Sequence, residues 1–179
     1  MPYNKELDSP EAIKKMRRDI DFDKLKNEII KELDENKEIV LSTSLGNRVT
    51  SRTVSYANDM FTIYFISWEH NKKILQINAN PKVALTLNRI QFEGKAEILG
   101  KVSENENDYI RSIFSKKSTK KAMDTFFSVP EMVLVKITPS SIVKFCNINK
   151  RFHFQVLDLI TKTACQMRLE DKEHPKFPL

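Results

Sequence analysis

Two groups of basic residues in the first half of the chain could hold an anion. One is Ser51-Arg52-Thr53, in which hydroxyl side chains flank the arginine, and the other is Asn71-Lys72-Lys73, at the start of a predicted short helix. Helix N-termini favour acidic residues because the helix dipole is positive there, so two lysines suggest a bound anion that offsets them. Taken alone, each group also fits a solvated surface. Together they predict one site that binds a phosphate group.

Several other kinds of site are excluded by missing motifs. The chain has three glycines, so it can contain neither G-x-G-x-x-G nor G-x-x-x-x-G-K, the loops that bind nucleotide phosphates in Rossmann and P-loop proteins. The three histidines are scattered and no cysteine lies at ligand spacing from them, so we expect no metal site. No G-x-S-x-G motif is present, and the catalytic residues remain unknown from sequence.

The charge balance is consistent with an anionic ligand. The formal net charge is +6, and the densest basic run comprises Lys116, Lys117, Lys120 and Lys121. This run lacks the interleaved aromatic residues that stack on nucleic-acid bases, so we expect no nucleic-acid partner and interpret the run as a solvated helix junction. Cys146 and Cys165 are expected to be free cysteines, because neither is in a C-x-x-C pair and no secretory signal is recognisable.

The elements that must position these residues follow from the period of the apolar residues. Leu25, Ile29, Ile30 and Leu33 recur at helical spacing. Further helices are predicted at 9–18, 71–77, 104–114 and 120–127. Alternating or β-branched runs predict strands at 39–43, 49–57, 60–67, 83–87, 92–99, 132–137, 142–146 and 152–160.

Residues 38–99 are predicted to form a small antiparallel β-barrel that holds a phosphorylated cofactor. Short turns join the strands, and parallel strands would need longer crossovers. The planar ring of the cofactor would lie along the edges of the strands at 49–57 and 60–67. Gly94, inside the strand at 92–99, predicts a bulge or a close backbone approach.

The predicted organisation is one domain with short appendages, mainly β with peripheral helices. Residues 1–20 are expected to form an N-terminal arm or short helix, 21–165 the single barrel domain and 166–179 a C-terminal tail. No apolar run is long enough to span a membrane and no signal peptide is recognisable, so we expect no membrane association and a cytoplasmic location.

Residues 37–99 resemble the pyridoxamine 5′-phosphate oxidase-like family of flavin-binding split β-barrels. The resemblance rests on an ordered set of short matches: IVLSTS, SRTVSY, FTIYFIS, N-K-K, N-P-K-V-A-L and F-E-G-K-A-E. The interval from Lys73 to Asn80-Pro81 and the E-G-x-A step are also typical of the family. The resemblance implies FMN bound at the interface of a homodimer, with Arg52, Lys72 and Lys73 on its phosphate.

The family pattern further carries over to residues beside the ribityl chain and ring, namely Thr53, Val54, Ser55, Phe65, Ile66 and Ser67. Asn71-Lys72-Lys73 stands where the family often has S-R-K, which keeps the charge but not the arginine fork. Deazaflavin and haem are alternative cofactors, because relatives of this barrel accommodate all three.

The implied activity is flavin-mediated electron or hydride transfer to an unidentified small molecule, with NAD(P)H as a possible donor. True pyridoxine-phosphate oxidases have a C-terminal segment with tryptophan and several arginines, whereas the only tryptophan here is Trp68. We therefore expect a stress-protein-like or nitroreductase-like member rather than a pyridoxine-phosphate oxidase. The alternative is a non-catalytic flavin- or haem-binding carrier or sensor.

Overall fold

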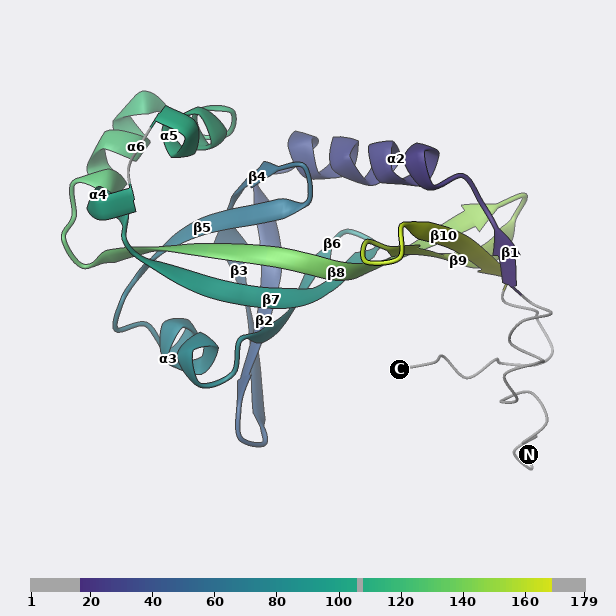
Figure 1. The fold of residues 1–179 in the computed structure, drawn as a ribbon, viewed down its shortest axis with the longest axis horizontal. Coiled ribbons are helices and arrows are strands. Elements are labelled where there is room, and N and C mark those ends of the chain that lie inside the picture. The colour runs from purple at the N-terminus through teal and green to yellow at the C-terminus, as the bar shows by residue number, and fades with distance from the viewer. Residues whose placement is uncertain (1–16, 106–107, 169–179) are drawn as a thin grey trace.

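In the computed structural model, which describes residues 17–105 and 108–168, one curled antiparallel sheet forms the centre of the molecule (Figure 1). Its strands in chain order are β1 (Arg17–Asp19), β2 (Glu38–Leu45), β3 (Arg48–Ser55), β4 (Ala57–Asp59), β5 (Thr62–Trp68), β6 (Lys82–Leu87), β7 (Ile90–Lys101), β8 (Met132–Ile148), β9 (Arg151–Asp158) and β10 (Thr163–Arg168). The helices are α2 (Phe22–Glu35), α3 (Lys72–Ala79), α4 (Val102–Asn105), α5 (Asp108–Ser115) and α6 (Lys120–Phe127). The prediction of a mainly β protein with peripheral helices is confirmed.

The barrel is split between β3 and β5. Neighbouring strands pair in the order β3-β2-β6-β7-β8, and the first part of β8 also pairs with β5. Within the described ranges, β3 pairs only with β2, and β5 beyond Tyr64 pairs only with β8. Each of these two strands therefore has an unpaired backbone edge. The prediction that residues 38–99 form the barrel by themselves is wrong, because β8 supplies the strand between β7 and β5.

Strand β8 corrects the prediction of two separate strands around Pro139. It is continuous from Met132 to Ile148, and the ladder with β7 changes register between Glu93 and Gly94, opposite Pro139. Because proline donates no hydrogen bond, an irregular point in the ladder is where a strand tolerates it. The predicted bulge at Gly94 is confirmed, since a Cβ there would lie 2.4 Å from the carbonyl oxygen of Thr138.

The ends of the described chain also differ from the prediction. Arg17, Arg18 and Asp19 are not helical but pair as β1 with β10, and residues 9–16 of the predicted helix lie outside the described residues. Gln166, Met167 and Arg168 continue β10, so the tail predicted at 166–179 does not begin at 166. Neither strand was predicted, because β1 has only three residues, all of them charged, and β10 is short and has no regular apolar alternation. Residues 169–179 lie outside the described residues.

Two apolar clusters hold the elements in place. Helix α2 lies across the sheet (Figure 1) and buries Leu25, Ile29 and Leu33 in the larger cluster, which fills the barrel. The smaller cluster joins α5 and α6 to the sheet and includes Ile113, Phe127 and others. Both helices therefore have an apolar face directed at the sheet, as their residue spacing predicts.

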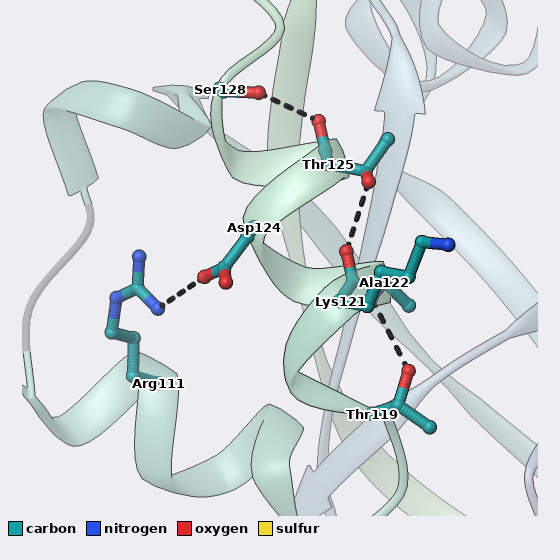
Figure 2. Close-up of polar contacts among 7 residues, drawn as sticks. All are labelled: Arg111, Thr119, Lys121, Ala122, Asp124, Thr125 and Ser128. Carbon is teal, nitrogen blue, oxygen red and sulfur yellow. Dashed lines mark hydrogen bonds and ion pairs between the residues drawn. The ribbon is translucent and has the colours of Figure 1, made fainter.

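Polar contacts fix the α5–α6 pair, and with it the loop between the two helices (Figure 2). The Thr119 hydroxyl accepts a hydrogen bond from the backbone N–H of Ala122 at 3.3 Å and caps α6. Arg111 of α5 pairs with Asp124 of α6 at 3.3 Å. These contacts hold residues 116–119 beside the C-terminal end of α2, where Lys117 makes the contacts described below.

No helix in the described part of the chain is both long and apolar enough to cross a membrane. Cys146 and Cys165 are free, as predicted.

Candidate functional site

The guanidinium group of Arg52 is held by neutral oxygen atoms. Arg52 lies on β3, and its Nη1 donates hydrogen bonds to the Thr43 hydroxyl at 2.6 Å and to the Leu41 carbonyl at 3.3 Å. Its Nη2 donates to the Thr50 hydroxyl and to Gln76 Oε1, the latter at 3.3 Å. Strands β2 and β3 thus present the arginine to Gln76 in the middle of helix α3, which lies beside the β2–β3 hairpin (Figure 1).

A second cation, Lys73, lies beside Arg52. Its Nζ donates to the Ser67 hydroxyl at 3.1 Å, and the Nδ2 atom of Asn71 donates to the same oxygen at 3.2 Å. Asn71 occupies the N-cap position of α3 as predicted, but its side chain bonds to Ser67 of β5 rather than to the helix. The Ser67 hydroxyl, near the end of β5, therefore fixes the side chains of Asn71, at the N-cap, and Lys73, in the first turn of α3.

Burial disfavours the charge on both side chains, and the charge of Arg52 further disfavours that of Lys73. Burial lowers the pKa of Lys73 and the positive charge of Arg52 lowers it further, while burial lowers the pKa of Arg52. Within residues 17–105 and 108–168, no carboxylate pairs with either side chain. Charged groups that are partly removed from water normally have a partner, so this arrangement suits an anionic ligand.

The residues present fit a phosphate group. Besides the two cations, the site contains an unpaired donor, because Gln76 Nε2 is buried without a hydrogen-bond acceptor. A phosphate has several acceptor oxygens and carries negative charge, so it matches the two cations. The described residues include no cluster of three or more histidine, cysteine or acidic side chains that could hold a metal ion.

The other predicted site residues divide between two faces of the sheet. Arg52 and Val54 are half-buried, whereas Thr53 and Ser55 alternate with them and are exposed on the opposite face. On β5, Phe65 is in the barrel core at 1 % exposure, so only its backbone is available to a ligand. Ile66 packs against the cluster under α5 and α6, and Ser67 contacts Lys73.

The two strands present their open backbone edges on either side of the split in the barrel. The predicted placement of a planar ring along the edges of β3 and β5 stays a prediction, but these edges have backbone groups without strand partners among the described residues. Arg52 lies on one face of β3 and Thr53 and Ser55 lie on the other, so a ligand that contacted all three would have to lie along the edge of this strand.

A cleft of about 760 Å³ opens on the outward face of β3. Thr53, Ser55 and Val40 form its floor, and Lys117 and Phe126 belong to its wall. The lining thus combines hydroxyl groups and apolar side chains with two lysines, Lys37 and Lys117, and one glutamate, Glu38. Such a mixture is typical of small-molecule sites.

Lys117 is an exception to the predicted solvated junction, in which Lys116, Lys120 and Lys121 are exposed as expected. Its Nζ donates to the carbonyl oxygens of Leu33 and Asn36, the latter at 2.7 Å, and lies 3.8 Å from the centre of the Tyr56 ring. Carbonyl groups at the C-terminal end of α2 need donors, and an ammonium group suits this negative end of the helix. Burial lowers the pKa of Lys117 to about 8.

Lys72, by contrast, is exposed on α3, and Lys73 is the lysine that the fold brings to Arg52. The sequence interpretation missed Thr43, Thr50 and Gln76. Gln76 follows Lys73 by three residues, so helical spacing could have placed both on one face of α3. Thr43 and Thr50 share the face of the β2–β3 pair that carries Arg52, which alternation along the strands could have indicated.

Comparisons with known proteins bear on this geometry. A family model described as Pyridoxamine 5′-phosphate oxidase matches residues 25–146. General stress protein 26 from Bacillus anthracis is 25 % identical, with a TM-score of 0.53 over 66 % of this chain and 91 % of that one. No curated protein matches the chain.

Two further solved structures share the fold at lower identity. A protein described as FAD-binding, from Mesorhizobium loti, is 17 % identical, with a TM-score of 0.51 over 84 % of this chain and 98 % of that one. HutZ from Vibrio cholerae, described as a heme storage protein, is 12 % identical, with a TM-score of 0.50 over 63 % of this chain and 88 % of that one.

Proposed function

The chain belongs to the pyridoxamine 5′-phosphate oxidase-like family, and on that basis we propose that it binds FMN at the split between β3 and β5. The observation that carries the proposal is the pair of cations, Arg52 and Lys73, without a carboxylate partner in the described part of the chain. FMN differs from a neutral flavin by a phosphate, which is the group this pair suits.

In this proposal the chain's own residues bind and orient the ligand. Arg52 and Lys73 hold the phosphate, and Ser67 and Asn71 fix the position of Lys73. Backbone groups of 52–55 and 65–67 lie beside the ring, with Thr53 and Ser55 contributing hydroxyl groups on the cleft side. Bound FMN would supply one- or two-electron transfer, so no side chain has to act as acid or base.

We further propose that the protein is an oxidoreductase for a small molecule, with NAD(P)H as a possible electron donor. The cleft beside Thr53 and Ser55 is open enough for a second ligand and includes both apolar and hydroxyl groups. A homodimer is part of this proposal, because a second copy would cover the exposed cleft wall. Oxidation of pyridoxine phosphate is not part of this proposal.

The first test is an absorbance spectrum of the purified protein, followed by titration of the flavin-free protein with FMN. We expect oxidised-flavin bands or saturable FMN binding, and reduction of the bound flavin by NADH or NADPH when an acceptor is present. Binding without reduction would support a flavin carrier or sensor rather than an enzyme. A protein that neither contains nor takes up flavin contradicts the proposal.

Haem storage is the second candidate function, because one structure with the same fold is described as a heme storage protein. The same spectrum distinguishes the two, since haem gives a Soret band and flavin does not. Titration with haemin and with a deazaflavin completes the comparison. Saturable haem binding without flavin binding would favour this second function.

A further inference from the structure

The side-chain amide of Gln76 lies at the centre of the hydrogen bonds around Arg52. Gln76 is 1 % exposed. Its Oε1 accepts hydrogen bonds from the Thr43 and Thr50 hydroxyls, each at 2.8 Å, and from Arg52 Nη2 at 3.3 Å. One buried oxygen atom therefore receives three donors, two from strands β2 and β3 and the third from the arginine itself.

The direction of these hydrogen bonds is determined by chemistry. A guanidinium group only donates, so the hydroxyl oxygens of Thr43 and Thr50 accept from Arg52. Each hydroxyl then has its own proton left to donate, and Gln76 Oε1 is the acceptor. If the amide were rotated by 180°, its NH₂ group would face the guanidinium, and two hydrogen-bond donors would then oppose each other. The amide orientation is thus fixed by Arg52.

Every acceptor in this network is neutral. The guanidinium is oriented by two hydroxyls, the Leu41 carbonyl and the Gln76 amide, and none of these cancels its charge. A glutamate at position 76 would offer the same oxygens but would pair with Arg52 and neutralise it. The glutamine orients the arginine while leaving its positive charge available to a ligand.

We propose that Gln76, acting through Thr43 and Thr50, positions Arg52 and thereby sets the preference of this site for a phosphate monoester over its dephosphorylated counterpart. Gln76 is a positioning residue for the phosphate end of the ligand. The identity of the ligand as a flavin rests on the function proposed above. The hydrogen-bond network around Arg52 does not depend on that proposal. The test therefore has one part that uses flavin and another that does not.

The flavin part compares FMN with riboflavin, which differ only in the phosphate. Gln76→Met keeps the length of the side chain and removes its hydrogen-bonding groups. We expect it to raise the Kd for FMN by about tenfold or more, the effect of losing a charge-assisted contact. The Kd for riboflavin should change by less than about twofold. Gln155→Met is the matched control, because Gln155 is a half-buried glutamine whose amide pairs with Gln166 on β10.

The second part uses inorganic phosphate and the melting temperature. At equal ionic strength, phosphate should raise the melting temperature of the wild-type protein more than chloride does, because a ligand that binds only the folded state stabilises it. This difference should disappear in Gln76→Met and in Gln76→Glu. Gln76→Glu keeps the acceptor oxygens, so it carries the test if Gln76→Met does not fold.

The outcomes separate this inference from the proposed function. Equal weakening of FMN and riboflavin in Gln76→Met would make Gln76 a general structural residue and would overturn the inference. Wild-type affinity for FMN in Gln76→Glu would overturn it as well. If wild-type protein binds no flavin but shows a phosphate shift that Gln76→Glu abolishes, the flavin proposal fails and the role of Gln76 stands. If phosphate gives no shift and FMN does not bind, both fail.

Discussion

At the scale of single residues, the informative feature is a pair of positively charged side chains that has no acidic partner among the described residues. Arg52 and Lys73 are half-buried neighbours, and their pKa values are both lowered. Folding alone gains nothing from bringing two cations together, since like charges repel and burial removes hydration. The arrangement becomes favourable when an anion binds. This argument concerns the phosphate end of a ligand and says nothing about the rest of it.

The two adjacent lysines of α3 should differ in importance. Lys73→Met should raise the Kd for FMN by about tenfold or more, because it removes the ammonium group beside Arg52 and with it a charge-assisted hydrogen bond to the phosphate. Lys72→Met is the matched control, since Lys72 is exposed and should contribute only a weak, screened attraction. Fluorescence titration of each variant with FMN measures both values. Equal effects of the two substitutions would contradict the assignment of the phosphate to Lys73.

Lys117 should make stability depend on pH. Burial disfavours the charged form and lowers its pKa from the ordinary value of 10.5 to about 8 in the folded protein. Between these two values the unfolded chain binds more protons at this residue than the folded chain. The contribution of Lys117 to the free energy of unfolding therefore rises as the pH increases from about 8 to about 10.5.

The comparison that isolates this effect is wild type against Lys117→Met. Urea unfolding at several pH values in this window should show that the difference in stability between the two proteins shifts in favour of wild type as the pH rises. Other groups with shifted pKa values, such as Cys165, titrate in both proteins and cancel. A pH-independent difference would mean that the buried ammonium is not destabilised in the folded state.

At the scale of elements, Gly94 holds two strands in an unusually close contact. A Cβ at this position would lie 2.4 Å from the Thr138 carbonyl oxygen and 2.7 Å from the Cα of Pro139, and both are backbone atoms that cannot turn aside. Gly94→Ala should therefore destabilise the protein by about 2–3 kcal/mol, as overpacking in a core does. Thermal and urea unfolding measure the change.

Gly46 provides the control for Gly94. It has φ of +57° in the turn between β2 and β3, and a Cβ there would meet nothing within 4 Å. Gly46→Ala should cost only about 1 kcal/mol, from the left-handed backbone conformation alone. A Gly94→Ala variant no less stable than Gly46→Ala would show that the β7–β8 contact can relax.

The sequence was sufficient to predict most elements and to single out Arg52 and Lys73, which the fold brings together. Periodicity identified α2, α3, α6 and the strands that carry Arg52 and Ser67, because amphipathic patterns are local. It could not reveal that β8 runs through Pro139, which depends on the room that Gly94 leaves in a neighbouring strand. Nor could it reveal that Lys117 bonds to carbonyl groups more than eighty residues away. Contacts of that range have no local signal.

At the scale of the whole molecule, the site lies within the part that the family shares, and further strands extend the sheet beyond it. The family model matches residues 25–146, whereas β9, β10 and β1 lie outside this match and prolong the sheet at the far end of β8 (Figure 1). Arg52, Lys73 and Gln76 all lie inside the match. The extension therefore enlarges the sheet without contributing to the anion site.

The proposed homodimer makes a prediction about that shared part. Val40 on β2 is 38 % exposed, lies directly opposite Thr53 of β3, and contributes to the floor of the outward cleft. If a second copy covers this cleft, sedimentation should give about twice the 20.9 kDa of a single chain. Val40→Glu should then yield monomers, because an interface would have to bury the new carboxylate.

The same variant also tests whether dimerisation and cofactor binding are linked. Val40→Glu leaves Arg52 and Lys73 in place, so a site contained in one chain would bind FMN with unchanged affinity. A site completed by the second copy would lose affinity together with the dimer, and added FMN would shift the monomer back towards dimer by mass action. Ile160→Glu is the control, since Ile160 is 78 % exposed in the turn between β9 and β10. A wild-type monomer that binds FMN tightly would contradict the homodimer while leaving the phosphate site intact.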